Sequence, residues 1–119
     1  MPTYPENLSA QNLDLTIRSE AHAATVTCVG RLTSQNAALL KTQVKSMIPQ
    51  EKHIVLDFTK LVGMDSSGLG ALVGLYLSAK SAKCQLQLIN LSKPVRDLLG
   101  LTNLLSVFES CADHGVRFP

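Results

Sequence analysis

The 119-residue sequence is predicted to fold as one α/β domain built around a mixed sheet. Its length fits a single domain that can bury a core without disulfides. Apolar residues make up 45% of the chain, as in folded globular proteins rather than disordered ones. In the second half, helix-like and strand-like segments alternate, which is typical of parallel crossover units, whereas the first two strand-like segments are close enough to pair as a hairpin.

A polar lead-in precedes the first two strands. Residues 1–12 are polar, contain two prolines and are predicted to be loose. Over residues 13–18 apolar and polar side chains alternate, which is the two-residue period of a half-buried strand. Residues 24–29 are rich in β-branched side chains and stop at Gly30, so they predict the second strand of the hairpin.

A helix and a central strand are predicted next. Apolar residues recur at helical spacing over residues 37–48, and Pro49 ends the pattern. The hydroxyl of Thr33 or Ser34 is predicted to cap this helix. Residues 53–58 are almost continuously apolar, as expected of a central strand covered on both faces.

The long apolar segment over residues 69–82 predicts a second helix. Its sheet-facing stripe is predicted to consist of the apolar residues Leu69, Leu72, Val73, Tyr76 and Leu77. Ala71, Leu75, Gly70 and Gly74 would then lie away from the stripe. Because a helical glycine costs about 1 kcal/mol relative to alanine, two of them indicate that the sheet or a partner approaches closely. We therefore expect a partner protein to bind around this helix.

The last third of the sequence predicts shorter elements. Residues 85–90 favour a strand, and a capping serine followed by a proline opens a short helix over residues 92–100. Residues 104–108 are predicted to be a final short strand, and residues 111–119 a tail. The domain is thus expected to span residues 13–110.

Composition argues against several classes of function. Aromatic residues are only 4% of the chain, and the net charge is only +2. The eleven Lys and Arg are scattered along the sequence, so a nucleic-acid-binding surface is not favoured. The odd number of cysteines (Cys28, Cys84 and Cys111) without a C-x-x-C pair predicts reduced thiols in the cytoplasm. No apolar run is long enough to cross a bilayer, and no metal or cofactor site is expected.

The most informative segment is Met64–Gly70, with the sequence Met-Asp-Ser-Ser-Gly-Leu-Gly. It lies between a predicted strand and a predicted helix, so its two serines fall at a helix N-terminus. Unpaired N–H groups and a partial positive charge make such a terminus a natural seat for a phosphate. Ser66 and Ser67 could simply cap the helix, but a cap needs only one hydroxyl, whereas this segment offers a carboxylate and two hydroxyls. The segment therefore predicts a serine switch.

Nucleotide-binding motifs fit this segment poorly. Gly63 and Gly68 have Walker A spacing, but Leu69 and Gly70 stand where lysine and a magnesium-binding hydroxyl are needed. A dinucleotide loop through Gly68, Gly70 and Gly74 is one residue too long.

A serine hydrolase is a more remote alternative. A nucleophile elbow needs glycine two residues before and two residues after the serine, and neither Ser66 nor Ser67 meets this condition. The histidines His22, His53 and His114 are far apart in the sequence, and none has a neighbour that indicates a catalytic base or a metal cluster.

The sequence resembles the STAS domain, specifically that of bacterial anti-sigma factor antagonists. The resemblance rests on Val-Leu-Asp-Phe at residues 55–58 followed by the motif at 64–70, and residues 92–104 are similar to the family's late helix. It extends over residues 13–108. It implies a single STAS-like α/β domain with a mixed four- to five-stranded sheet covered by three to four helices.

The resemblance also implies partner switching. The unphosphorylated antagonist would bind an anti-sigma factor serine kinase, which frees the sigma factor. The kinase would phosphorylate Ser67, the complex would dissociate, and a serine phosphatase would reset the cycle. Asp65, Ser66, Gly68 and Gly70 would shape the switch turn. The chain would be substrate and ligand, not an enzyme.

Partner contacts are expected from the switch turn, the helix after it and the loop before the first helix. The residues predicted to make them are Met64, Leu69, Ala71, Leu75, Arg31 and Thr33. The sequence departs from the family at 30–33, which is Gly-Arg-Leu-Thr here and usually Gly-Glu-Leu-Asp. An acid is thus replaced by Arg31, and charge complementarity selects partners.

Other interactions expected for the chain are few. No nucleic acid and no membrane insertion are expected, and the domain is predicted to be a monomer or a weak dimer. The alternative within the family is a STAS-type scaffold or accessory subunit of a signalling or lipid-transport complex, without a phosphorylation cycle.

Overall fold

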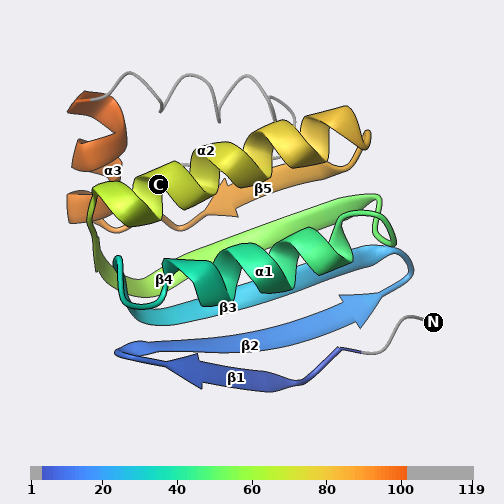
Figure 1. Ribbon diagram of the computed structural model, residues 1–119, viewed down its shortest axis with the longest axis horizontal. Helices are drawn as coiled ribbons and strands as arrows, with labels where there is room; N and C mark the ends of the chain where they lie inside the picture. Colours follow the sequence, from blue (N-terminus) through green and yellow to red (C-terminus); the bar gives the residue numbers. More distant parts are fainter. Residues whose placement is uncertain (1–3, 102–119) are drawn as a thin grey trace.

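The computed structural model describes residues 4–101, which form a five-stranded mixed sheet with three helices (Figure 1). The strands follow one another across the sheet in sequence order: β1 (Asn7–Ala10), β2 (Leu13–Glu20), β3 (Ala23–Leu32), β4 (His53–Met64) and β5 (Gln85–Ile89). The helices are α1 (Ala37–Met47), α2 (Ser66–Ser81) and α3 (Lys93–Leu101). The predicted α/β class and mixed sheet are confirmed, since β1, β2 and β3 are antiparallel while β3, β4 and β5 are parallel.

Helices α1 and α2 lie side by side over one face of the sheet, and the core fills the space beneath them (Figure 1). On β2 the alternate residues Leu13, Leu15 and Ile17 are buried toward this core, and those between them are exposed or half-buried. The matching residues of β3 and β4 include Val26, 0% exposed, and Leu56, also 0% exposed. The period of two in the sequence thus reports which side of the sheet carries the helices.

The N-terminal lead-in is more ordered than its sequence indicates. Residues 7–10 form β1, which pairs with β2 through a turn where Asn12 adopts a left-handed backbone with φ of 62°. Upstream of β1, the Tyr4 hydroxyl donates a hydrogen bond of 2.7 Å to Glu51, which is buried. The prediction of a loose segment is wrong for this part because strand pairing and a distant carboxylate, rather than local periodicity, order it.

Strand β4 is twice as long as predicted. Its apolar alternation breaks at Thr59 and Lys60, where the pairing with β3 shifts register, and resumes at the buried Leu61. A bulge of this kind hides the continuity of a strand from a periodicity argument. As a result β4 carries the chain without interruption to Met64, which only Asp65 separates from the two serines.

Helix α2 starts at Ser66 and is rotated relative to the prediction. Its buried residues are Gly68, Ala71, Leu72, Leu75 and Ala79. Leu77, which was expected to face the sheet, is 59% exposed, whereas Ala71 and Leu75 are 6% and 0% exposed. The prediction that Ala71 and Leu75 lie away from the sheet-facing stripe is therefore wrong, and in the free domain neither side chain is exposed to a partner. Periodicity fails here because α2 is apolar on nearly every side, so several stripes fit the sequence equally well.

The start of α1 also differs from the prediction. Neither Thr33 nor Ser34 caps the helix with its side chain. The N-cap position is occupied by Asn36, whose side chain makes no capping hydrogen bond either. The Asn36 side chain instead holds the loop together, accepting from the Thr33 N–H (2.8 Å) and donating to the Arg31 carbonyl (2.9 Å). The predicted strand at 104–108 and the tail at 111–119 lie outside the described residues.

Candidate functional site

The Asp65 carboxylate organises the turn between β4 and α2. The residue has an extended backbone, and its side chain caps the helix: one oxygen accepts from the N–H groups of Ser67 (2.9 Å) and Gly68 (3.1 Å). The other oxygen accepts from the N–H of Ser34 (3.1 Å), in the loop before α1. Asp65 also donates its own N–H to the carbonyl of Leu32 (3.1 Å). One residue thus ties the ends of β3 and β4 to the start of α2.

These hydrogen bonds favour the charged form of Asp65. The N–H of Gly68 contributes most to lowering the pKa of the carboxyl, with further contributions from the N–H groups of Ser34 and Ser67. The helix N-terminus therefore already holds a fixed anion. A phosphate on Ser67 would lie next to that anion, so the terminus is less of a free phosphate seat than the sequence indicates.

Both serines of the turn are exposed. They are the first two residues of α2, and within residues 4–101 neither hydroxyl makes a hydrogen bond. The cap is made by the Asp65 carboxylate instead, which leaves both hydroxyls available to another molecule. The hypothesis that the serines merely cap the helix is therefore not supported.

The glycines of α2 have different roles. A Cβ at Gly68 would come within 2.6 Å of the Leu32 carbonyl oxygen, so this residue lets the helix start against the end of β3. At Gly74 a Cβ would lie 3.5 Å from the Lys41 side chain of α1, whereas at Gly70 it would meet nothing within 4 Å. The close approach expected at Gly70 and Gly74 is not found at either residue: Gly70 faces open space, and a Cβ at Gly74 would make only an ordinary contact. The tight contact with the sheet is at Gly68 instead.

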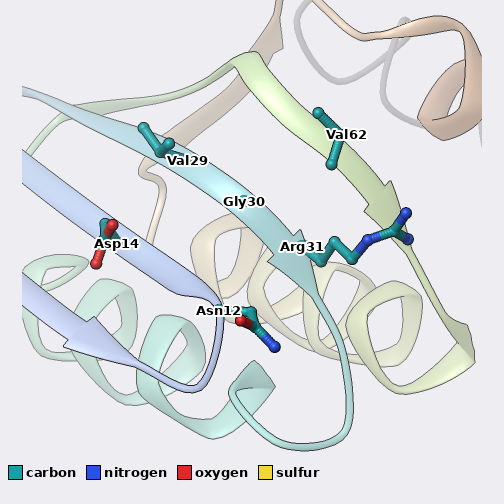
Figure 2. A pocket seen from close by; sticks show the side chains of 6 residues that line it. All are labelled: Asn12, Asp14, Val29, Gly30, Arg31 and Val62. Atoms are coloured by element: carbon teal, nitrogen blue, oxygen red, sulfur yellow. The ribbon is translucent and has the colours of Figure 1, made fainter.

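The remaining predicted contact residues lie at the same end of the sheet. Met64 and Leu69 are half-buried and pack against the core beside the turn. Thr33 is half-buried and accepts a hydrogen bond from the N–H of Gln35 (3.3 Å). Arg31 is exposed, and its guanidinium lies over Gly63 near the end of β4 (Figure 2).

The backbone of Ser34 was missed as part of the site. Its N–H binds Asp65 across a sequence separation of 31 residues. The sequence signal for Ser34 was that of a cap for α1, and no local pattern could have assigned it to α2.

Catalytic and metal chemistry find little support at this turn. The ring of His53 contacts the Gln87 side chain on the sheet, and no histidine within residues 4–101 hydrogen-bonds to either serine. The same residues contain no group of three or more His, Cys, Asp or Glu placed to hold a metal ion. Cys28 and Cys84 are buried, and burial raises the pKa of the Cys28 thiol, which disfavours its nucleophilic thiolate form. Among the described helices none has the length and apolar character needed to span a bilayer.

The chain as a whole is similar to known proteins. The family model described as "STAS domain" matches residues 13–115. An anti-sigma F factor antagonist from Paenibacillus polymyxa is 28% identical over 99 residues, covering 80% of this chain and 85% of the relative.

Two solved structures of the antagonist SpoIIAA have a similar fold. The unphosphorylated form superimposes with a TM-score of 0.68 at 20% identity, over 76% of this chain and 81% of SpoIIAA. The phosphorylated form, described as a Bacillus cell fate determinant, gives a TM-score of 0.65 at 19% identity, over 77% and 86%.

Proposed function

The chain belongs to the STAS domain family, and we propose that it acts within it as an anti-sigma factor antagonist whose partner is exchanged by phosphorylation of Ser67. In the unphosphorylated state it binds an anti-sigma factor serine kinase in the cytoplasm. Phosphorylation by that kinase ends the complex, and a serine phosphatase restores the binding form.

The exposed hydroxyl of Ser67 beside the charged Asp65 carries this proposal. A kinase needs an accessible hydroxyl on a backbone it can hold, and the Ser67 N–H is fixed by the Asp65 cap. The relative that is an anti-sigma F factor antagonist and the SpoIIAA fold, known in both phosphorylation states, support the same role.

The electrostatics of the turn supply the reason for release. Phosphorylation adds a charge of about −1.5 to −2 at neutral pH. In the free domain water screens the repulsion between that charge and Asp65. In an interface both anions are desolvated together, and each loss of about 1.4 kcal/mol in binding free energy weakens affinity tenfold. A modest electrostatic penalty is therefore enough to exchange partners, with no rearrangement of the fold.

Intact-mass measurement tests the covalent step. The full chain is incubated with ATP and each anti-sigma factor kinase of its own genome, and one kinase should add a single phosphate. Ser67→Ala should abolish the addition, whereas Ser66→Ala, the adjacent and equally exposed control, should retain it. A phosphate on another residue, or none with every kinase, would contradict the proposal and favour the scaffold function.

Binding measurement tests the exchange. Ser67→Asp should bind the same kinase at least about tenfold more weakly than the wild type, because it adds a second carboxylate beside Asp65. Equal affinity of Ser67→Asp and Ser67→Asn would remove the electrostatic basis of release.

A further inference from the structure

A groove lies at the ends of β3 and β4, on the sheet face turned away from α1 and α2 (Figure 2). Its volume is about 430 Å³, and we call it the Arg31 groove; it is lined by Asn12, Asp14, Val29, Gly30, Arg31 and Val62. Val62 is 55% exposed, one of two large apolar side chains in the described part of the chain with such exposure. The groove therefore combines an exposed apolar wall with an arginine.

The position of the arginine depends on a missing side chain. Its guanidinium lies across β4 at Gly63, where a Cβ would come within 2.6 Å of the Arg31 Nη1. Any other residue at Gly63 would push the guanidinium away. The planar donors of a guanidinium match both oxygens of a carboxylate, so a carboxylate is the group that Arg31 is suited to bind here.

No ion pair in the described part of the chain neutralises the charge of Arg31. Within residues 4–101 the only ion pair joins Lys93 and Asp97, so no carboxylate there pairs with Arg31. A second exposed cation, Lys60, stands opposite Val29 in the strand register. The acid of the groove, Asp14, belongs to β2 and accepts a hydrogen bond from the Ser9 hydroxyl (2.6 Å). The side of the groove formed by β3 and β4 is thus positive.

The groove is also connected to the switch turn. Arg31 precedes Leu32, whose carbonyl accepts the N–H of Asp65 (3.1 Å). Two residues further on, Ser34 donates its N–H to the Asp65 carboxylate (3.1 Å). The groove and the switch turn therefore lie at the same end of the sheet, where β3 and β4 finish.

We propose that the Arg31 groove receives an acidic side chain of the anti-sigma factor partner, with an apolar neighbour packed on Val62. This inference rests on the proposed function and adds the chemistry of the partner surface. The unpaired guanidinium defines the charge that the partner must carry, and the position of Asp14 directs the carboxylate to the β4 side. The kinase that recognises this chain would thus present an acidic side chain to Arg31.

Charge reversal provides the first test, with the kinase identified by the phosphorylation experiment as the probe. Arg31→Glu should weaken binding of the unphosphorylated full chain at least about tenfold. The matched control is Arg18→Glu, because Arg18 is also exposed but lines a separate hollow around the β2–β3 turn. This control should bind like the wild type.

Gly63→Ala provides a second test that leaves Arg31 in the sequence. Gly63 does not have a left-handed backbone, and the colliding atom is the end of a flexible side chain, so the fold should tolerate alanine. The displaced guanidinium should lower the affinity for the kinase several-fold at an unchanged melting temperature. The affinity of the wild type should also fall more steeply with salt than that of Arg31→Gln.

The outcomes separate this inference from the proposed function. If Arg31→Glu and Gly63→Ala bind like the wild type while Ser67→Asp does not, the groove inference is wrong and the switch stands. Tighter binding by Arg31→Glu would mean a basic partner and would also overturn the inference. If no anti-sigma factor kinase binds the wild-type chain, both proposals fall. Restoration of Arg31→Glu by an acid-to-arginine change in the kinase would support the groove directly.

Discussion

The inner and outer faces of α2 each carry a leucine and a glycine, but these residues have opposite roles on the two faces. The inner face holds Leu75, which is 0% exposed, and Gly68, which starts the helix against β3. The outer face holds Leu77, which is 59% exposed, and Gly70, next to which a Cβ would have open space. Each face therefore has a leucine and a glycine, and only packing distinguishes them. The comparison teaches that the inner face sets stability, which leaves the outer face open to interactions.

The two leucines should show the largest difference between the faces. Leu75→Ala should lower the free energy of unfolding by about 2–5 kcal/mol, because it leaves a cavity in a filled core. Leu77→Ala should stay within about 0.5 kcal/mol of the wild type. Urea denaturation followed by circular dichroism measures both. Similar losses for the two variants would mean that α2 is rotated from the orientation described.

The two glycines should come next, with opposite signs. Gly68→Ala should destabilise by about 1–3 kcal/mol, since the new methyl group meets the backbone carbonyl of Leu32 and cannot be accommodated by a rotamer change. The same denaturation curves measure this loss. A stabilised Gly68→Ala would show that the start of α2 is free to shift away from β3.

Gly70→Ala should instead stabilise by about 0.5–1 kcal/mol, because alanine is the better helix former and nothing is in its way. The gain should appear as a higher urea midpoint at an unchanged slope. Destabilisation by this substitution would indicate that the outer face is covered in the free protein.

The pH dependence of the helix cap should give the smallest effect. The folded state lowers the pKa of Asp65, so its stabilising contribution is present above the pKa of the unfolded chain and is lost as pH falls through the lower folded value. Stability should therefore decline on the acid side of about pH 4, the usual value for aspartate, and Asp65→Asn should lack part of that decline. Parallel acid profiles of the two proteins would contradict the contribution of the cap.

The sequence predicted elements whose residues carry an unambiguous period. Strand β2 alternates cleanly from Leu13, and the pairing that it predicted with β3 is present. The turn between β4 and α2 was also predictable, because an acid and two serines that follow a strand-like segment are typical of a helix N-terminus. These signals are local, and therefore the sequence alone contains them.

What escaped prediction depends on contacts between distant residues. The pairing that makes β1 a strand, the bulge that conceals the length of β4 and the bond from Ser34 to Asp65 all join separate segments. The rotation of α2 escaped for another reason, since an apolar helix offers several equivalent stripes. Ala71 and Leu75, which were expected to face away from the sheet, are accordingly buried in the core.

The double attachment of the Asp65 carboxylate has a consequence for how the loop before α1 behaves. Amide hydrogens exchange with solvent when their hydrogen bonds open, and the Ser34 amide depends on one oxygen of a side chain that belongs to another segment. A phosphate on Ser67 would compete with the Asp65 carboxylate for the same few N–H donors. Faster deuterium uptake at the Ser34 amide would then report a change at the first turn of α2.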